Sequence, residues 1–63
     1  MSTEYRKNLL GVLARLDRLY TEVEAVLSAP ADVEIGVRAE ELRELVVEMR
    51  AMVEDKVDRL TSC

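Results

Sequence analysis

The chain has 63 residues, enough for one small domain, and its composition of 49% apolar and 35% charged residues is typical of long helices or coiled coils. Its formal net charge of −4 argues against non-specific binding to nucleic acid or to an anionic membrane, which needs excess Lys and Arg. Cys63 is the only cysteine and there is no histidine, so a disulfide within the chain is excluded and a structural zinc site is disfavoured. Oligomerisation is the remaining way to stabilise so small a domain.

The location that we expect is the cytoplasm. No apolar run approaches the roughly 18 residues of a membrane span, and Met1 to Glu4 lack the basic and apolar regions of a signal peptide. The lone thiol also fits a reducing compartment. We therefore predict a cytoplasmic protein that has no contact with a membrane.

The first predicted helix runs from about residue 3 to residue 27. Its apolar residues recur at the 3–4 spacing of a heptad seam, at positions a and d, with a second apolar line at position e. These residues are the first half of a predicted core and dimer interface: Tyr5, Leu9, Val12, Leu13, Leu16, Leu19, Tyr20, Val23, Val26 and Leu27.

The outer face of this first helix carries small residues and cations. It is either a surface under no constraint or a groove in which a partner helix approaches closely. A glycine inside a helix costs about 1 kcal/mol relative to alanine, so Gly11 favours the second interpretation. Leu10 and Val47 are apolar residues outside the main seams and are candidates for the rim of such a contact. The candidate partner surface is Lys7, Leu10, Gly11, Ala14, Arg15, Arg18, Thr21 and Ala25.

A turn is predicted at residues 28–31, because Pro30 cannot lie inside a helix without losing a hydrogen bond and clashing with the preceding turn. Ser28 and Asp32 are helix-capping residue types. The second helix is therefore expected from about residue 31 to residue 61. Between Val33 and Val37, however, apolar residues alternate as in a short strand, and a loop extending to Gly36 is the alternative.

The second predicted helix repeats the pattern of the first. Its seam becomes polar at Lys56 and Arg59. Either the packed core ends near Val53 and the last turns fray or extend their charged ends to water, or these cations pair with carboxylates across a dimer and fix its orientation. The second half of the predicted core and dimer interface is Ile35, Leu42, Leu45, Val46, Met49, Met52, Val53 and Leu60, and Ala39 also falls on the e line.

The width of these apolar faces predicts association with a second chain. In a lone hairpin each helix has one neighbour, so part of an apolar face that spans positions a, d and e remains exposed to solvent. Burying one Leu or Val is worth about 1.5–3 kcal/mol, so several half-exposed side chains forfeit an energy comparable to the stability of a small domain. We predict an all-α fold, a two-helix antiparallel hairpin that dimerises into a four-helix bundle. Parallel and antiparallel docking, a tetramer and a hetero-oligomer all stay open.

Residues that could carry chemistry are scarce, and we expect no enzyme, cofactor or metal site. Without histidine, neither Ser–His nor Cys–His nucleophile pairs can form. Cys63 is either a solvated thiol or the site of an intermolecular disulfide on oxidation. Glu40, Glu44 and Glu48 are spaced four apart, on a stripe expected to face water. Pairs that would add a few tenths of a kcal/mol each are Glu34–Arg38, Arg50–Glu54 and Asp55–Arg59.

In length and layout, two heptad helices joined at residues 28–32, the chain resembles the Rop family of plasmid copy-number regulators. Those helical hairpins dimerise and bind paired RNA hairpins through polar, basic and aromatic residues on the first helix. Lys7, Arg15 and Arg18 are the candidates for such a role in this chain, but no aromatic residue lies among them, and no residue is carried over from the family. The layout is also similar to the small hairpin co-chaperones of type III secretion and to many small phage and plasmid regulators.

The function we expect is that of a non-enzymatic interaction protein, a homodimer with a further protein partner, acting as a regulator, adaptor, inhibitor or co-chaperone. A Rop-like RNA-binding regulator is the alternative, although the acidic charge disfavours nucleic acid. A purely structural oligomerisation module is the third hypothesis.

Overall fold

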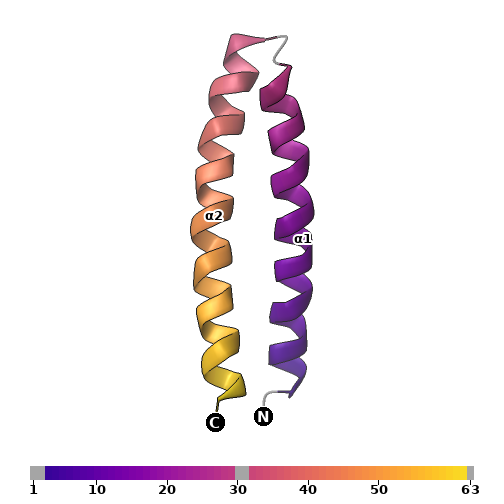
Figure 1. Ribbon diagram of the computed structural model, residues 1–63, viewed down its shortest axis with the longest axis vertical. Coiled ribbons are helices and arrows are strands. Elements are labelled where there is room, and N and C mark those ends of the chain that lie inside the picture. Colours follow the sequence, from indigo (N-terminus) through magenta and orange to yellow (C-terminus); the bar gives the residue numbers. More distant parts are fainter. Residues whose placement is uncertain (1–2, 30–31, 63) are drawn as a thin grey trace.

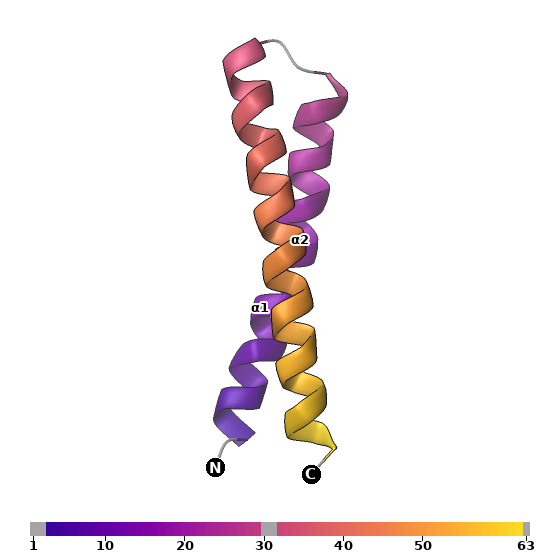
Figure 2. The same cartoon turned by 90° about the vertical axis from the view of Figure 1, so that its left-hand side faces the viewer.

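A computed structural model of the chain describes residues 3–29 and 32–62. These residues form two α-helices and no strand: α1 spans Thr3–Ser28 and α2 spans Val33–Thr61. The helices run antiparallel, with both chain ends at the same end of the molecule (Figure 1). The molecule is a rod of 46 × 14 × 13 Å. Turned by 90°, the two helices cross obliquely (Figure 2). The predicted all-helical hairpin is confirmed.

The end of α1 lies one residue later than predicted, at Ser28 rather than Leu27. The Ser28 hydroxyl donates a hydrogen bond of 2.9 Å to the Ala25 carbonyl, within the last turn of the helix. Of the turn predicted at residues 28–31, Pro30 and Ala31 lie outside the described residues.

The start of α2 is capped by Asp32. Its backbone is extended (φ −145°, ψ 124°), and its carboxylate accepts hydrogen bonds from the amides of Glu34 (2.8 Å) and Ile35 (3.3 Å). The amide of Gly36 donates to the Asp32 carbonyl at 2.9 Å, as in the first turn of a helix. The alternative of a loop extending to Gly36 is therefore wrong: the cap satisfies the free amides of a helix that begins at Val33.

The far end of α2 is ordered up to its cap. The amide of Ser62 donates to the Asp58 carbonyl at 2.9 Å, and Arg59 forms an ion pair of 2.9 Å with Asp55, one turn earlier. The interpretation in which the last turns fray is wrong, since the helix continues to Thr61. Cys63 lies outside the described residues.

The buried core of the hairpin consists of four valines, Val23 in α1 and Val46, Val53 and Val57 in α2. Val57 is only 8% exposed, so the core does not end near Val53 as one of our two interpretations had it. The reason is that Val57 lies four residues beyond Val53, on the side of α2 that faces α1. Around these valines six further residues of the predicted α1 seam are half-buried, whereas Tyr5, Tyr20 and Val26 are exposed; the six are Leu9, Val12, Leu13, Leu16, Leu19 and Leu27.

The stripe of α2 that packs on α1 is displaced from the predicted a/d seam. It follows the e line, through Ala39, Val46 and Val53, and continues at Val57. The a and d residues of α2 are turned to one side and remain exposed. One neighbouring helix can cover only part of a face as wide as a, d and e together, and the short valines at this contact allow the helix axes to lie close.

Candidate functional site

One long side of the hairpin is apolar and uncovered; we call it the open apolar side. It contains the exposed a and d residues of α2, of which Met52 is 67% and Leu45 is 61% exposed. Residues of α1 at position d complete it. Its exposed members are Tyr5, Val26, Ile35, Leu42, Leu45, Met49 and Met52.

Two grooves run along the open apolar side. The turn-end groove has a floor of small and branched residues, with Glu22 and Arg38 at its border; it is lined by Leu19, Glu22, Val23, Val26, Ile35, Arg38, Ala39 and Leu42. The terminal groove has larger side chains and one cation; it is lined by Tyr5, Leu9, Met49, Met52, Val53 and Lys56.

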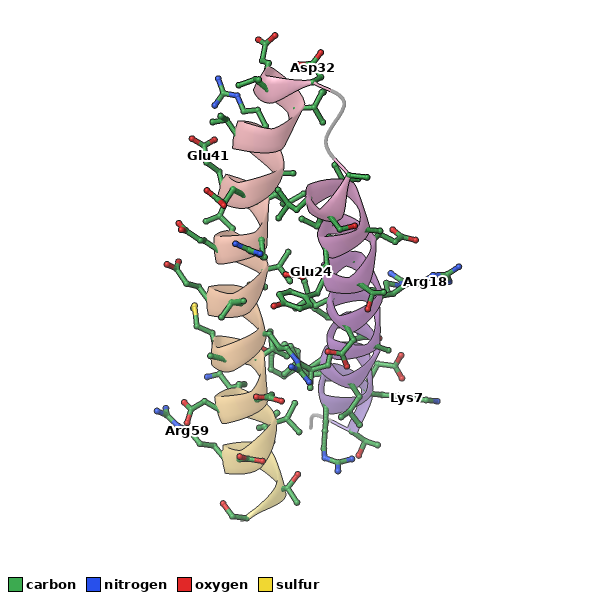
Figure 3. The ribbon with its side chains drawn as sticks, turned by 45° about the horizontal axis from the view of Figure 1, so that its top comes forward. Lys7, Arg18, Glu24, Asp32, Glu41 and Arg59 are labelled. Carbon is green, nitrogen blue, oxygen red and sulfur yellow. The ribbon has the colours of Figure 1, made fainter. Side chains whose placement is uncertain are left out.

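The opposite long side, which we call the paired side, is bridged by ion pairs between the helices. Arg43 lies 2.9 Å from Glu24, and Arg50 lies 2.9 Å from Asp17. Figure 3 shows Glu24 directed into the space between α1 and α2. Near the chain ends, Arg6 Nε donates to the Thr61 hydroxyl at 3.0 Å. From one of these contacts to the next, the residue in α1 lies as many positions later in the chain as its partner in α2 lies earlier. These contacts therefore define the register of the hairpin.

The Glu24 carboxylate raises the pKa of the Arg43 guanidinium above its ordinary value, first through their hydrogen bond and then through charge attraction. Partial loss of water around Arg43 acts in the other direction and is outweighed. Arg43 also lies 3.5 Å from Glu40 on its own helix. Arginine is charged at every pH at which proteins are handled, and the raised pKa of Arg43 leaves that charge unchanged.

A second groove region lies on the paired side. Its border is mixed in charge, with Arg43, Glu44, Glu48, Arg50 and Glu54 around an apolar centre of Tyr20, Val46, Val47 and Ala51. Tyr20 is 38% exposed, so this predicted core residue lies at the edge of the hairpin core. Val47, predicted as a rim residue, is 51% exposed in this groove.

The candidate partner surface of α1 is solvent-exposed at all eight of its positions. Lys7 and Arg18 are directed away from α2 (Figure 3). A Cβ atom added at Gly11 would meet no atom within 4 Å, so the hairpin itself gives no reason for a glycine there. Arg18 lies 3.8 Å from Glu22, a loose pair between exposed side chains.

The acidic residues of α2 lie on its exposed surface, as predicted for Glu40, Glu44 and Glu48. Among residues 3–29 and 32–62, no three side chains of metal-binding type are gathered closely enough to hold an ion. Of the predicted pairs within α2, Arg50–Glu54 (3.7 Å) and Asp55–Arg59 (2.9 Å) are confirmed. Arg38 pairs instead with Glu41 at 3.0 Å, because residues three apart on a helix are also neighbours.

Sequence reasoning missed the two ion pairs between the helices and the burial of Val57. A signal for the ion pairs is present in the chain: Asp17 and Glu24 are seven residues apart, as are Arg43 and Arg50. Opposite charges repeated at heptad spacing on two antiparallel helices can meet twice at one register.

No helix in the described part of the chain combines the length and the apolar character that crossing a membrane requires. Comparisons of the chain with protein-family models, curated proteins and solved structures find no match.

Proposed function

We propose that the chain is a non-enzymatic interaction protein, a homodimeric four-helix bundle that acts as a small regulator, adaptor, inhibitor or co-chaperone through protein contacts. The observation that carries the proposal is the asymmetry of the hairpin. Ion pairs bridge its paired side, whereas large apolar side chains line its open apolar side, where the five a and d residues of α2 are 40% to 67% exposed.

The free energy gained by burying exposed apolar side chains supports a second copy as the occupant of the open apolar side. Each Leu, Ile, Val or Met brought out of water contributes about 1.5–3 kcal/mol when fully buried, so half-burial of seven exposed residues in each of two copies is of the same order as the cost of association. Two hairpins placed face to face cover this side completely, and a two-fold symmetric pair needs no other chain.

The dimer is tested by Leu45→Glu, with Val47→Glu as the matched control. Leu45 is 61% and Val47 is 51% exposed, two residues apart on the same helix but on opposite long sides of the hairpin. We expect light scattering behind a sizing column to give twice the chain mass for the unchanged protein and for Val47→Glu, and the chain mass for Leu45→Glu. A folded, unchanged protein with the mass of one chain at micromolar concentration would contradict the proposal.

The partner of such a dimer would meet what the bundle leaves outside, and the candidate partner surface of α1 is the first region to test. The substitution Gly11→Glu introduces a charge where the hairpin has open space, so it leaves the fold intact. Val37→Glu, at a 53% exposed position of α2, is the control. We expect a protein captured from the native cell extract by the unchanged chain and by Val37→Glu to be lost with Gly11→Glu. Equal capture by all three would exclude this surface.

A Rop-like RNA-binding regulator is the second candidate. The observation that favours it is that Lys7 and Arg15 are exposed on α1 and form no ion pair with residues 3–29 and 32–62. Contacts between these cations and phosphates would weaken steeply with salt. RNA binding that persists in Arg15→Glu combined with Arg18→Glu would exclude this surface as the RNA contact, and the absence of RNA binding by the unchanged chain would exclude the regulator itself.

A further inference from the structure

We infer that the second copy docks antiparallel to the first, in what we call the inverted arrangement, with the turns of the two hairpins at opposite ends of the bundle. This inference rests on the proposed dimer and specifies its geometry. Two hairpins that pair face to face about a two-fold axis have two choices. Either α1 lies over α1 and α2 over α2, with the turns at opposite ends, or α1 lies over α2, with the turns at the same end.

The apolar residues of the open apolar side are spaced symmetrically about one level of the hairpin. Asp17 lies level with Arg50, so Leu19, two residues later, lies level with residue 48, beside Met49. On α1, Val12 and Val26 lie seven residues before and after Leu19. A two-fold axis through this level therefore places Leu19 of the two copies together at the middle of the contact, with Val12 of one copy against Val26 of the other on either side of it.

The same level is also the centre of symmetry on α2. Leu45 lies four residues before Met49, and Met52 lies three residues after it. When two α2 helices cross antiparallel at Met49, Leu45 of one copy meets Met52 of the other. Because Met49 is near the middle of Val33–Thr61, the two hairpins overlap along almost their whole length.

The charged border of α1 favours the inverted arrangement. Arg15 lies four residues before Leu19 and Glu22 lies three residues after it, and both are exposed. In the inverted dimer, each Arg15 is therefore opposite Glu22 of the second copy. With the turns at the same end, Glu22 would lie level with Leu45 of the second copy, where Glu41 and Glu48 border the stripe. Arg15 meets carboxylates in either arrangement. Inversion brings the two copies of Glu48 near each other beside Met49, which is one like-charge contact, whereas the other arrangement places both copies of Glu22 between two carboxylates, so Glu22 favours inversion.

The sizes of the side chains in the two grooves agree with this choice. The turn-end groove is lined by smaller residues such as Val26, Ile35 and Ala39, and the terminal groove by larger ones such as Tyr5 and Met52. Inversion places the terminal groove of one copy over the turn-end groove of the other, so that large side chains face small ones. With the turns at the same end, each groove would face the equivalent groove of the second copy.

The cations at the ends of the α2 stripe are accommodated as well. Lys56 lies seven residues after Met49, which in the inverted dimer brings it level with Leu42 and beside Glu41 of the second copy. Arg38 and Arg59 come near each other there, but each already has a carboxylate partner on its own helix, at 3.0 Å from Glu41 and 2.9 Å from Asp55.

A distance between two spin labels tests the arrangement. Val33, at the turn end of α2, is 84% exposed, so Val33→Cys in a Cys63→Ser background accepts a label without disturbing the core. In the inverted dimer we expect the two labels to be separated by about the 46 Å length of the hairpin. With the turns at the same end, they would lie within roughly 30 Å, the cross-section of four helices with label arms.

The matched control is a label at Arg18→Cys, exposed and near the level of the proposed axis, in the same Cys63→Ser background. Both arrangements predict a separation within roughly 30 Å for this label. A long Val33 distance with a short Arg18 distance supports the inference. Short distances for both labels overturn it while leaving the dimer intact. Failure of both labelled proteins to couple, together with the mass of one chain, overturns the inference and the proposed dimer alike.

Discussion

Among the described residues, four valines form the interior of this hairpin, and none of the larger apolar residues there is as deeply buried. Val46 is 3% and Val53 is 4% exposed, whereas Leu42 and Met49 on the same helix are 40% and 46% exposed. A valine at a contact between two helices brings the axes close and loses little side-chain entropy. The flexible and longer side chains are left on the open apolar side, where they can adapt to a second surface.

Truncation of a buried valine tests this division. We expect Val46→Ala to lower the free energy of unfolding by about 1–3 kcal/mol, through lost burial and the cavity left behind. Val47→Ala, at a 51% exposed neighbour, should change it by less than about 0.5 kcal/mol. Urea unfolding followed by circular dichroism measures both. Equal losses for the two variants would contradict the assignment of the core.

Gly11 allows a second test at the scale of a residue. Because a Cβ atom there meets no atom within 4 Å, Gly11→Ala should raise the free energy of unfolding by about 0.5–1 kcal/mol through helix propensity alone. Thermal unfolding of the purified protein gives the sign. A loss of stability would mean that another backbone packs closely on this position in the assembled protein.

Each helix is held by its own caps and by pairs along its surface, and the two are aligned by charges that cross between them. Asp32 satisfies two free amides at the start of α2. The ion pairs of Arg43 with Glu24 and of Arg50 with Asp17 then set the register of α2 against α1. Exposed pairs of this kind contribute little energy individually, so they select an alignment of the helices whose stability comes from the apolar contact.

The cap at Asp32 makes a prediction for the whole of α2. Asp32→Ala should lower the free energy of unfolding by about 1 kcal/mol, because the amides of Glu34 and Ile35 lose their acceptor. Asp32→Asn keeps a capping oxygen and should cost only a few tenths of a kcal/mol. Chemical denaturation of the two variants separates them; a loss as large with asparagine as with alanine would show that capping is not the cause.

For the molecule as a whole, the proposed burial of the open apolar side by a second copy would couple folding to association. If two copies bury this side, the thermal midpoint should rise with chain concentration, because dimerisation by mass action stabilises the folded state. A scanning calorimetry series over a hundredfold range of concentration measures the rise. A midpoint independent of concentration would indicate that one chain folds and stays alone.

Leu42 gives a second test at this scale, since it is 40% exposed in the hairpin. In a dimer that buries it, Leu42→Ala should cost roughly 2–5 kcal/mol and favour dissociation, which sedimentation can follow. In a lone hairpin the same substitution would have a much smaller effect. Glu44→Ala, at an exposed polar position, is the control and should leave both stability and mass nearly unchanged.

By itself the sequence determined the secondary structure. Pro30 between two heptad patterns predicts two helices, and the capping residues at positions 28 and 32 predict their ends to within one or two residues. These features are local, because capping and helix propensity depend on residues within a turn of one another. The amount of apolar surface was also evident, since it exceeds what one neighbouring helix can cover.

The tertiary structure alone decided which part of that surface the hairpin uses. A heptad pattern fixes a face only to within one neighbouring line, and positions d and e of α2 were equal candidates for the contact with α1. In the folded hairpin, Val46 and Val53 of the e line and Val57 are buried against α1. The ion pairs that Arg43 and Arg50 form with carboxylates of α1 bridge one side of the hairpin. The a and d residues were thereby left on the other side, because rotation of α2 about its axis depends on contacts between residues far apart in the chain.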